Sequence, residues 1–317
     1  MRKYQASDNI YQMLDTTNPF VKWRNILSND WPICPAQLPV DAYTSSDQDS
    51  KSWYFPWKSS DTLERWNENI EKQEYSAEFG YHQNAHGYRC DEFEDIMNRP
   101  TKKLLTLGCS NTYGIGVPEE HTWPQMLKSQ FEHRKNEKID VINLGAPGGS
   151  NQLIDVYLNW CHRFKPDYIA VLLAPKDRKL AIDENGIMTN LGPWNTSDSV
   201  WSNQMPNAQC YNNRQEMSKF IEAHYLYVEQ QLKFETNVVV NKLKMIGDIG
   251  NIPIAYLFPE VRNPQAETYL GISQNVTPED WEIVGNPIKT HVGRDGAHPG
   301  SIFYLTVAKE FFKKLNT

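Results

Sequence analysis

Hydrophobic and polar positions follow a regular order only after about residue 100. From there, short apolar runs typical of buried strands alternate with segments whose apolar residues recur at helical spacing. Strands are predicted over 103–107, 140–144, 167–173 and 252–258. Helices are predicted over 122–133, 151–164, 215–249 (with one break near 234–237) and 301–315. The stretches 174–213 and 259–294 show no regular period and are expected to be loop-like or irregular.

This order of elements predicts an α/β fold with a central parallel sheet and helices on both faces. The run 167–173 is almost continuously apolar, as expected of a strand buried on both sides. Reactive groups in such folds gather at the carboxyl ends of the strands. The segments that follow the predicted strands are therefore the places to look for chemistry.

The first part of the chain has weak strand periodicity and many Trp, Asn, Asp and Ser residues. We expect residues 1–80 to form an aromatic-rich extension or accessory region and residues 81–317 to form the main domain. A short helix is predicted over 61–73. The aromatic cluster 53–57 is either a sugar-binding platform or ordinary packing against the main domain.

Composition narrows the function classes. The 317 residues carry a net charge of −7 without a long basic run, which argues against a nucleic-acid partner. The N-terminus lacks the apolar core of a signal peptide, and no apolar stretch is long enough to span a membrane. The five cysteines are scattered without a CxxC pair, which argues against a structural zinc site. A cytoplasmic or virion-associated protein is the expectation.

The abrupt end of the first predicted strand is the most informative local feature. Gly108 allows the backbone to turn sharply after 103–107, and Ser110 follows two residues later. We expect the Ser110 hydroxyl to project above the edge of the sheet. An exposed serine on such a turn is a candidate nucleophile if a base lies nearby.

Two further segments are candidates for the same site. The glycine-rich stretch 143–151 is either an oxyanion-binding wall of backbone N–H groups or an ordinary tight turn between strand and helix. Asp295 and His298, separated by two residues, can form a carboxylate–imidazole pair that leaves the second ring nitrogen to act as a base. Such pairs are also found as surface or helix-cap residues, and Ser301 begins the next predicted helix.

Taken together, these segments resemble the motifs of the SGNH or GDSL hydrolases, an esterase- and lipase-like family. Gly108-Cys109-Ser110 stands where the family has Gly-Asp-Ser, and 143–150 is similar to its second block. The last block, Asp-x-x-His-Pro, is matched by 295–299, and 84–89 is similar to a segment upstream of the nucleophile in many members. The resemblance covers roughly residues 80–317.

The resemblance implies a three-layer, flavodoxin-like α/β/α sandwich and ester hydrolysis. Ser110 would be the nucleophile, His298 the general base and then acid, and Asp295 the group that orients the imidazole. The N–H groups of Ser110 and Gly148 would hold the oxyanion. The resemblance implies no metal ion and no organic cofactor.

Two positions depart from the family pattern. The aspartate before the serine is replaced by Cys109, which raises the alternative of a thiol nucleophile, although consecutive residues on a turn point in different directions. Lys176 occupies the place of the third-block Asn, whose amide contributes to the oxyanion hole, and removing one such donor typically costs ~100–1000-fold in turnover. Lys176 could replace that donor, and Arg178 could fill the same space or bind an anionic substrate group.

We expect the substrate to be an acylated small molecule or glycan, with acetyl esters of carbohydrates ahead of lipids because the chain has no extended apolar insertion. Trp194 and Trp201 are candidates for a lid or substrate wall, or for simple packing. The rival function class is a binding or structural protein, for example a virion or surface-assembly component, that keeps the fold without useful catalysis. In either class, residues 1–80 could contact a protein partner.

Overall fold

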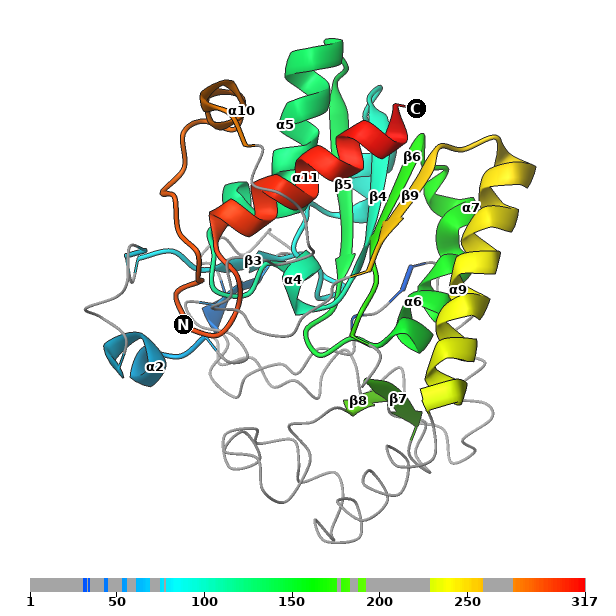
Figure 1. The fold of residues 1–317 in the computed structure, drawn as a ribbon, viewed down its shortest axis with the longest axis horizontal. Helices are drawn as coiled ribbons and strands as arrows, with labels where there is room; N and C mark the ends of the chain where they lie inside the picture. Colours follow the sequence, from blue (N-terminus) through cyan, green and yellow to red (C-terminus); the bar gives the residue numbers. More distant parts are fainter. Residues whose placement is uncertain are drawn as a thin grey trace, which may run out of the picture.

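In a computed structural model, the chain is described over residues 31–32, 34, 43–44, 53–55, 61–68, 75–76, 78–175, 178–182, 188–191, 229–258 and 276–316. A central parallel sheet lies between two layers of helices (Figure 1). Its strands are, in spatial order, β5 (Ile139–Gly145), β4 (Lys102–Gly108), β6 (Tyr168–Leu172) and β9 (Ile254–Leu257). The predicted α/β fold is confirmed.

The apolar runs become strands because both faces of the sheet are covered. Every residue of β5 and β6 is buried, and in β4 only the first residue is not. Successive residues of β4 alternate between two cores: Leu105 and Leu107 face one helical layer, and Leu104 faces the other. This double burial explains why the strand sequences are almost uninterruptedly apolar.

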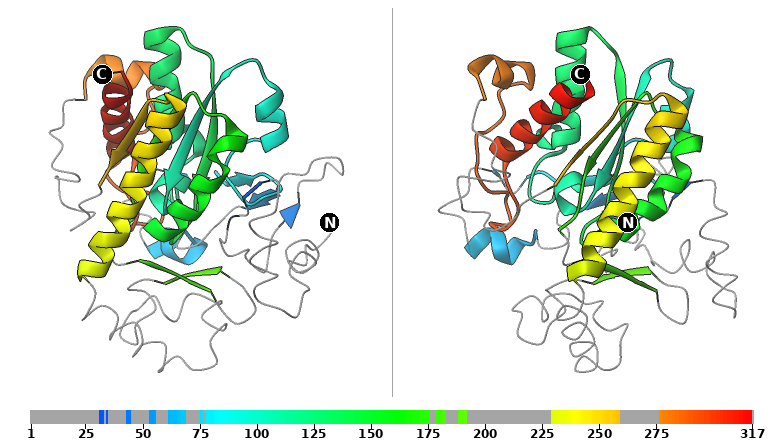
Figure 2. Two further views of the ribbon diagram at one scale, coloured as in Figure 1. Left: turned by 90° about the vertical axis from the view of Figure 1, so that its right-hand side faces the viewer. Right: turned by 45° about the vertical axis from the view of Figure 1, so that its right-hand side comes forward.

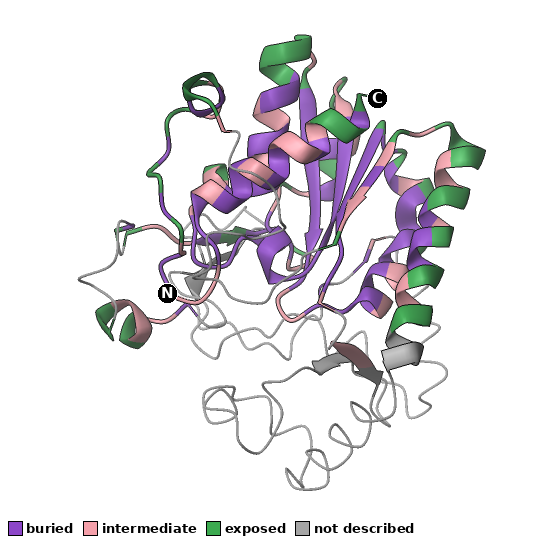
Figure 3. Ribbon diagram, viewed as in Figure 1, coloured by how far each residue is buried: buried purple, intermediate pink, exposed green. Residues whose placement is uncertain are grey.

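The two helical layers are α6, α7 and α9 on one face and α5 and α11 on the other (Figures 1 and 2). The long helices are α5 (Trp123–Lys135), α9 (Glu229–Gly250) and α11 (Ser301–Leu315). The shorter ones are α2 (Leu63–Glu68), α3 (Phe93–Asn98), α4 (Ser110–Tyr113), η3 (Glu119–His121), α6 (Asn151–Tyr157), η4 (Leu158–Trp160), α7 (Cys161–Phe164) and α10 (Pro278–Ile283). The face of α9 that points away from the sheet is largely exposed, whereas the outward face of α11 is mostly half-buried and is exposed only near the end of the helix (Figure 3).

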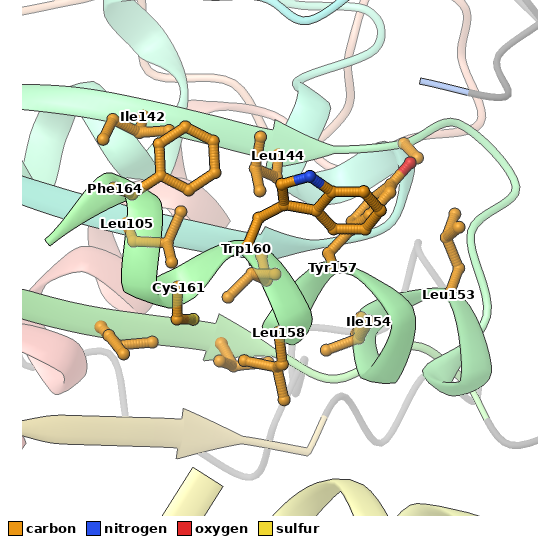
Figure 4. Close-up of a cluster of buried hydrophobic side chains, with 14 of the residues drawn as sticks. Leu105, Ile142, Leu144, Leu153, Ile154, Tyr157, Leu158, Trp160, Cys161 and Phe164 are labelled. Atoms are coloured by element: carbon orange, nitrogen blue, oxygen red, sulfur yellow. The ribbon is translucent and has the colours of Figure 1, made fainter. Parts of the chain in front are cut away.

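The core between β4–β5 and the α6–α7 segment shows how that layer is attached (Figure 4). Side chains from α6, η4 and α7 reach Leu105 on β4 and Ile142 and Leu144 on β5. The predicted helix over 151–164 is interrupted by the η4 turn, so it is three short helical pieces rather than one. In contrast, the predicted break near 234–237 is wrong, because α9 runs through these residues as a continuous helix.

Two small antiparallel sheets were not predicted. The strands β1 (Tyr43–Thr44), β2 (Trp53–Phe55) and β3 (Tyr81–Gln83) form one, and β7 (Lys179–Ile182) pairs with β8 (Met188–Leu191) in the other. The helix predicted over 61–73 is described only as α2, and the part of the predicted long helix before residue 229 lies outside the described residues. No helix in the described ranges combines the length and apolar character needed to cross a membrane.

Part of the aromatic N-terminal sequence packs on the main core. The Trp31 ring stacks on Phe164 at 5.1 Å between centroids and lies 5.5 Å from Phe93. This contact favours the packing alternative for Trp31. The side chains of the cluster 53–57 lie outside the described residues.

Candidate functional site

Ser110 lies where β4 ends and the chain turns into α4. A Cβ at Gly108 would lie 2.0 Å from Thr112 Oγ1 and 2.6 Å from the Leu172 carbonyl oxygen, so only glycine permits this close return of the chain. The left-handed Gly114 ends α4, and its N–H donates to the Ser110 carbonyl at 2.8 Å. The bend is therefore held by its own backbone contacts, with Ser110 at its start.

The glycine-rich segment after β5 lies against this bend. Ala146 N–H donates to the Gly108 carbonyl at 3.1 Å, and Gly149 N–H closes a tight turn onto Ala146 at 2.8 Å. Gly148 lies in that turn with a left-handed φ of 73°. Among the described residues, the N–H groups of Ser110 and Gly148 donate to no backbone carbonyl. The segment is thus a tight turn, one of the two alternatives, and its geometry is also compatible with the oxyanion alternative.

Asp295 and His298 form a close pair in the turn before α11. Asp295 Oδ2 lies 2.6 Å from His298 Nδ1, while Oδ1 accepts from the backbone N–H groups of Ala297 at 3.1 Å and His298 at 2.9 Å. Gly293 N–H donates to the His298 carbonyl at 2.7 Å and closes the turn. The Asp295 side chain is fully buried and that of His298 is 18% exposed.

This pairing fixes the chemistry open to the imidazole. A carboxylate only accepts hydrogen bonds, so Nδ1 carries a proton in this contact. In the neutral ring, Nε2 is then the basic nitrogen, which is the tautomer required of a general base. The contact with Asp295 therefore leaves Nε2 of His298 as the nitrogen that could accept a proton.

The turn that carries this pair packs against the Ser110 segment. Arg294 N–H donates to the Gly116 carbonyl at 2.6 Å, and Ile115 N–H, one residue earlier, donates to the Ser110 carbonyl at 3.1 Å. A Cβ at Gly116 would lie only 3.1 Å from Asp295 Oδ1. Among the described contacts, no hydrogen bond joins the Ser110 hydroxyl to the His298 ring. The turn therefore contacts the chain shortly after the bend, at Gly116.

Of the other residues predicted for the site, the structure describes Arg178 and Cys109. Arg178 Nη1 lies 3.5 Å from the Gly149 carbonyl, so this cation is beside the glycine-rich turn. Cys109 is fully buried and Ser110 is 4% exposed, so the serine is not the exposed side chain expected from the sequence, because the β5–α6 segment and the rest of α4 pack around it. Lys176, Trp194 and Trp201 lie outside the described residues. No group of three or more His, Cys, Asp or Glu side chains in the described parts of the chain is arranged to hold a metal ion.

Several polar residues that shape the site were not singled out from the sequence. Asn143 Nδ2 donates to the Thr112 carbonyl at 3.0 Å, and its Oδ1 accepts from Gly145 N–H at 2.9 Å. Asn143 thereby ties the end of β5 to α4. The signal was present, because an Asn inside an otherwise apolar strand must find buried partners.

A second group of polar residues contacts the Ser110 segment at Gly116 and adjoins the Asp295–His298 turn: Asp61, Tyr81 and Arg294. All three side chains are fully buried, and Arg294 contacts Asp61 across 233 positions of the sequence. Burial raises the pKa of the Tyr81 phenol well above its usual value, and the neighbouring Asp61 adds to this shift. Burial also raises the pKa of the Asp61 carboxyl, while the Arg294 guanidinium opposes that rise. No local pattern predicts this group, because its members come from distant segments.

By sequence, no protein-family model and no curated protein matches the chain. Among solved structures, it is similar to a family 3 carbohydrate esterase of Clostridium thermocellum, with 15% identity and a TM-score of 0.32 over 67% of this chain and 94% of that one. It is also similar to Axe2, an acetylxylan esterase from Geobacillus stearothermophilus, with 14% identity and a TM-score of 0.28 over 70% of this chain and 97% of that one. Similarity at this level does not carry activity, substrate or catalytic residues from one protein to another.

Proposed function

We propose that this protein is a serine ester hydrolase of the SGNH type. Ser110 is the nucleophile, His298 the general base and acid, and Asp295 the residue that orients the imidazole. The observation that carries the proposal is the 2.6 Å Asp295–His298 contact in a turn that is hydrogen-bonded to the segment following Ser110. A carboxylate–imidazole pair beside a serine on a strand-end turn is the arrangement that serine hydrolases of unrelated folds share.

The proposed reaction passes through an acyl-enzyme. The Ser110 oxygen attacks the ester carbonyl while its proton passes to His298 Nε2. The resulting oxyanion is held by the N–H groups of Ser110 and Gly148, each typically worth ~3 kcal/mol in acyl transfer. The alcohol leaves with the proton from the imidazole. Water then attacks the acyl group while His298 takes its proton, and the imidazole returns this proton to the Ser110 oxygen as the acid leaves.

The substrate we propose is an acetylated carbohydrate or another small ester. Support comes from the polar segments around the site and from a chain without an extended apolar insertion for a long acyl group. Arg178 would bind an anionic or polar substrate group, Lys176 would supply a further oxyanion contact, and Trp194 and Trp201 would form a wall. Residues 81–317 would form the hydrolase domain, with residues 1–80 as an extension open to a protein partner.

The rival proposal is an impaired SGNH-fold protein that binds rather than cleaves. Lys176 in place of the third-block Asn favours it, because the family's third oxyanion donor is lost. A turnover assay with p-nitrophenyl acetate and an acetylated oligosaccharide separates the two. The esterase proposal predicts turnover by wild-type and Cys109→Ala protein and none by Ser110→Ala. Folded wild-type protein that cleaves neither ester would refute it in favour of the binding protein.

A further inference from the structure

Arg294 and Asp61 form an ion pair that is completely removed from solvent. Arg294 Nε lies 3.0 Å from both Asp61 oxygens, and Nη2 lies 2.6 Å from Oδ2. Arg294 Nη1 donates to the Phe79 carbonyl at 2.8 Å, and the guanidinium lies 3.7 Å from the centre of the Phe79 ring. Charges buried this deeply are tolerated only with such multiple contacts, so the relative position of the two segments is closely defined.

The ion pair is part of a closed ring of hydrogen bonds. Tyr81 Oη donates to Asp61 Oδ2 at 2.5 Å and accepts from Gly116 N–H at 2.8 Å. The Gly116 carbonyl accepts from Arg294 N–H at 2.6 Å, which returns the ring to the arginine. Both backbone polar groups of Gly116, its N–H and its carbonyl, are therefore used. The phenol stays protonated at neutral pH, because burial raises its pKa, and it can donate and accept at once.

The ring joins the two loops that carry the proposed catalytic groups. Arg294 directly precedes Asp295, so its backbone is part of the catalytic turn. On the other side, Gly116 follows the bend that begins at Ser110. Arg89, also from the upstream segment, donates from Nη1 to the Gly114 carbonyl at 2.6 Å. Residues before the nucleophile thus hold the bend at both Gly114 and Gly116.

We propose that Asp61 and Arg294 are positioning residues whose ion pair, closed through Tyr81 and Gly116, clamps the Asp295–His298 turn against the Ser110 segment. The catalytic consequence rests on the proposed esterase function, whereas the clamp itself rests on the contacts alone. Removing one partner leaves the other charge buried without compensation, so the turn should loosen at that point. If the Asp61–Arg294 pair only attached the upstream segment to the domain, breaking it would lower the stability of the whole protein without a selective increase in the mobility of the 293–298 turn.

The test compares two buried aspartates. Asp61→Asn breaks the ion pair with Arg294. Asp280→Asn breaks the ion pairs of another buried aspartate with Arg134 on α5 and Lys309 on α11. Amide hydrogen exchange is measured alongside kcat and KM for a small ester. Asp61→Asn is expected to speed exchange at Arg294 about tenfold or more and to lower kcat about 100-fold with little change in KM. Asp280→Asn is expected to speed exchange only around 277–282 and to leave kcat unchanged.

Two further variants keep the test decisive if Asp61→Asn fails to fold. Tyr81→Phe removes a single hydroxyl, retains the aromatic packing and should show the same pattern of exchange to a smaller extent. The double variant Asp61→Leu with Arg294→Met leaves no orphaned charge, so it should recover stability. It is not expected to recover kcat, because the directional contacts to the turn are gone.

The outcomes separate the clamp from the esterase proposal. Unchanged exchange at Arg294 in folded Tyr81→Phe and Asp61→Asn protein would overturn the clamp, as would wild-type kcat in the double variant. If wild-type protein cleaves no ester, the esterase proposal fails. The exchange comparison then still decides whether the clamp holds the turn.

Discussion

Replacing Gly145 with alanine tests whether the close approach of β5 and α4 positions Ser110, the proposed nucleophile. A Cβ at this position would lie 2.3 Å from Tyr113 N, 2.7 Å from Thr112 C and 2.8 Å from Tyr113 Cα. These are backbone atoms that cannot rotate away, so the strand end and the bend must separate. Ordinary contact begins at 3.4 Å, so the two segments must move apart by about 1.1 Å.

The expected cost falls more heavily on activity than on stability. Forcing a methyl group into a filled interior typically costs about 1–3 kcal/mol, which leaves a protein of ordinary stability folded. A displacement of about 1 Å at a reacting group can lower the rate about 100-fold. Gly145→Ala should therefore remain folded while losing about two orders of magnitude in the rate at which a fluorophosphonate probe labels Ser110.

The assay pairs urea unfolding with labelling kinetics, and Gly285→Ala is the matched control. Gly285 has a left-handed φ of 81° but no heavy atom within 4 Å of an added Cβ, so alanine there is strained without displacing anything. Its expected cost is about 1–2 kcal/mol, similar to that of Gly145→Ala. Labelling of Gly145→Ala at the control's rate would refute the argument that this contact positions Ser110.

Three further outcomes are expected. Burial alone would raise the pKa of Asp280, but hydrogen bonds from Lys309 and from Thr277, the N-cap of α10, lower it below its usual value. The stability that ionised Asp280 contributes should therefore be complete at neutral pH and fall as pH drops below about 4. In Asp280→Asn, the urea midpoint should lose this part of its pH dependence. Ser150 caps α6 by accepting from Leu153 N–H at 3.3 Å, so Ser150→Ala should cost about 1 kcal/mol in urea unfolding, and an unchanged midpoint would contradict the cap. His298→Asn should lower ester turnover by about four orders of magnitude with a wild-type circular dichroism spectrum, and a loss of less than tenfold would exclude His298 as the base.

The sheet and its main helices could be predicted from the sequence because their patterns follow from double-sided burial. The runs that form β4, β5 and β6 are buried along almost their whole length, and α11 begins and ends as its apolar spacing predicts. The β1–β3 sheet was missed because its strands are two or three residues long, too short for a period to show. The break predicted in α9 was wrong because the polar residues at this point are bound by α6: Gln152 donates to Glu235 at 2.9 Å and Asn151 donates to Thr236 at 3.1 Å.

The candidate site divides in the same way. Ser110, Asp295 and His298 could be chosen from short motifs because each follows from local chain chemistry, a turn after a strand or a pair in one turn. Their catalytic roles are still predictions. The ion pair of Asp61 and Arg294 could not be chosen, because either residue alone resembles an ordinary surface charge. Only the fold reveals that both side chains are fully buried and in contact.

The measurement that bears most directly on the account is where a fluorophosphonate becomes attached. Intact-mass analysis followed by peptide mapping of the labelled protein identifies the residue that carries the probe, without any assumption about the substrate. A single adduct on Ser110, retained in Cys109→Ala and lost in Ser110→Ala and His298→Ala, is the predicted result. Folded protein that takes up no probe, or takes it up on another residue, would contradict the claim that this hydroxyl is activated by the imidazole across the sheet rim.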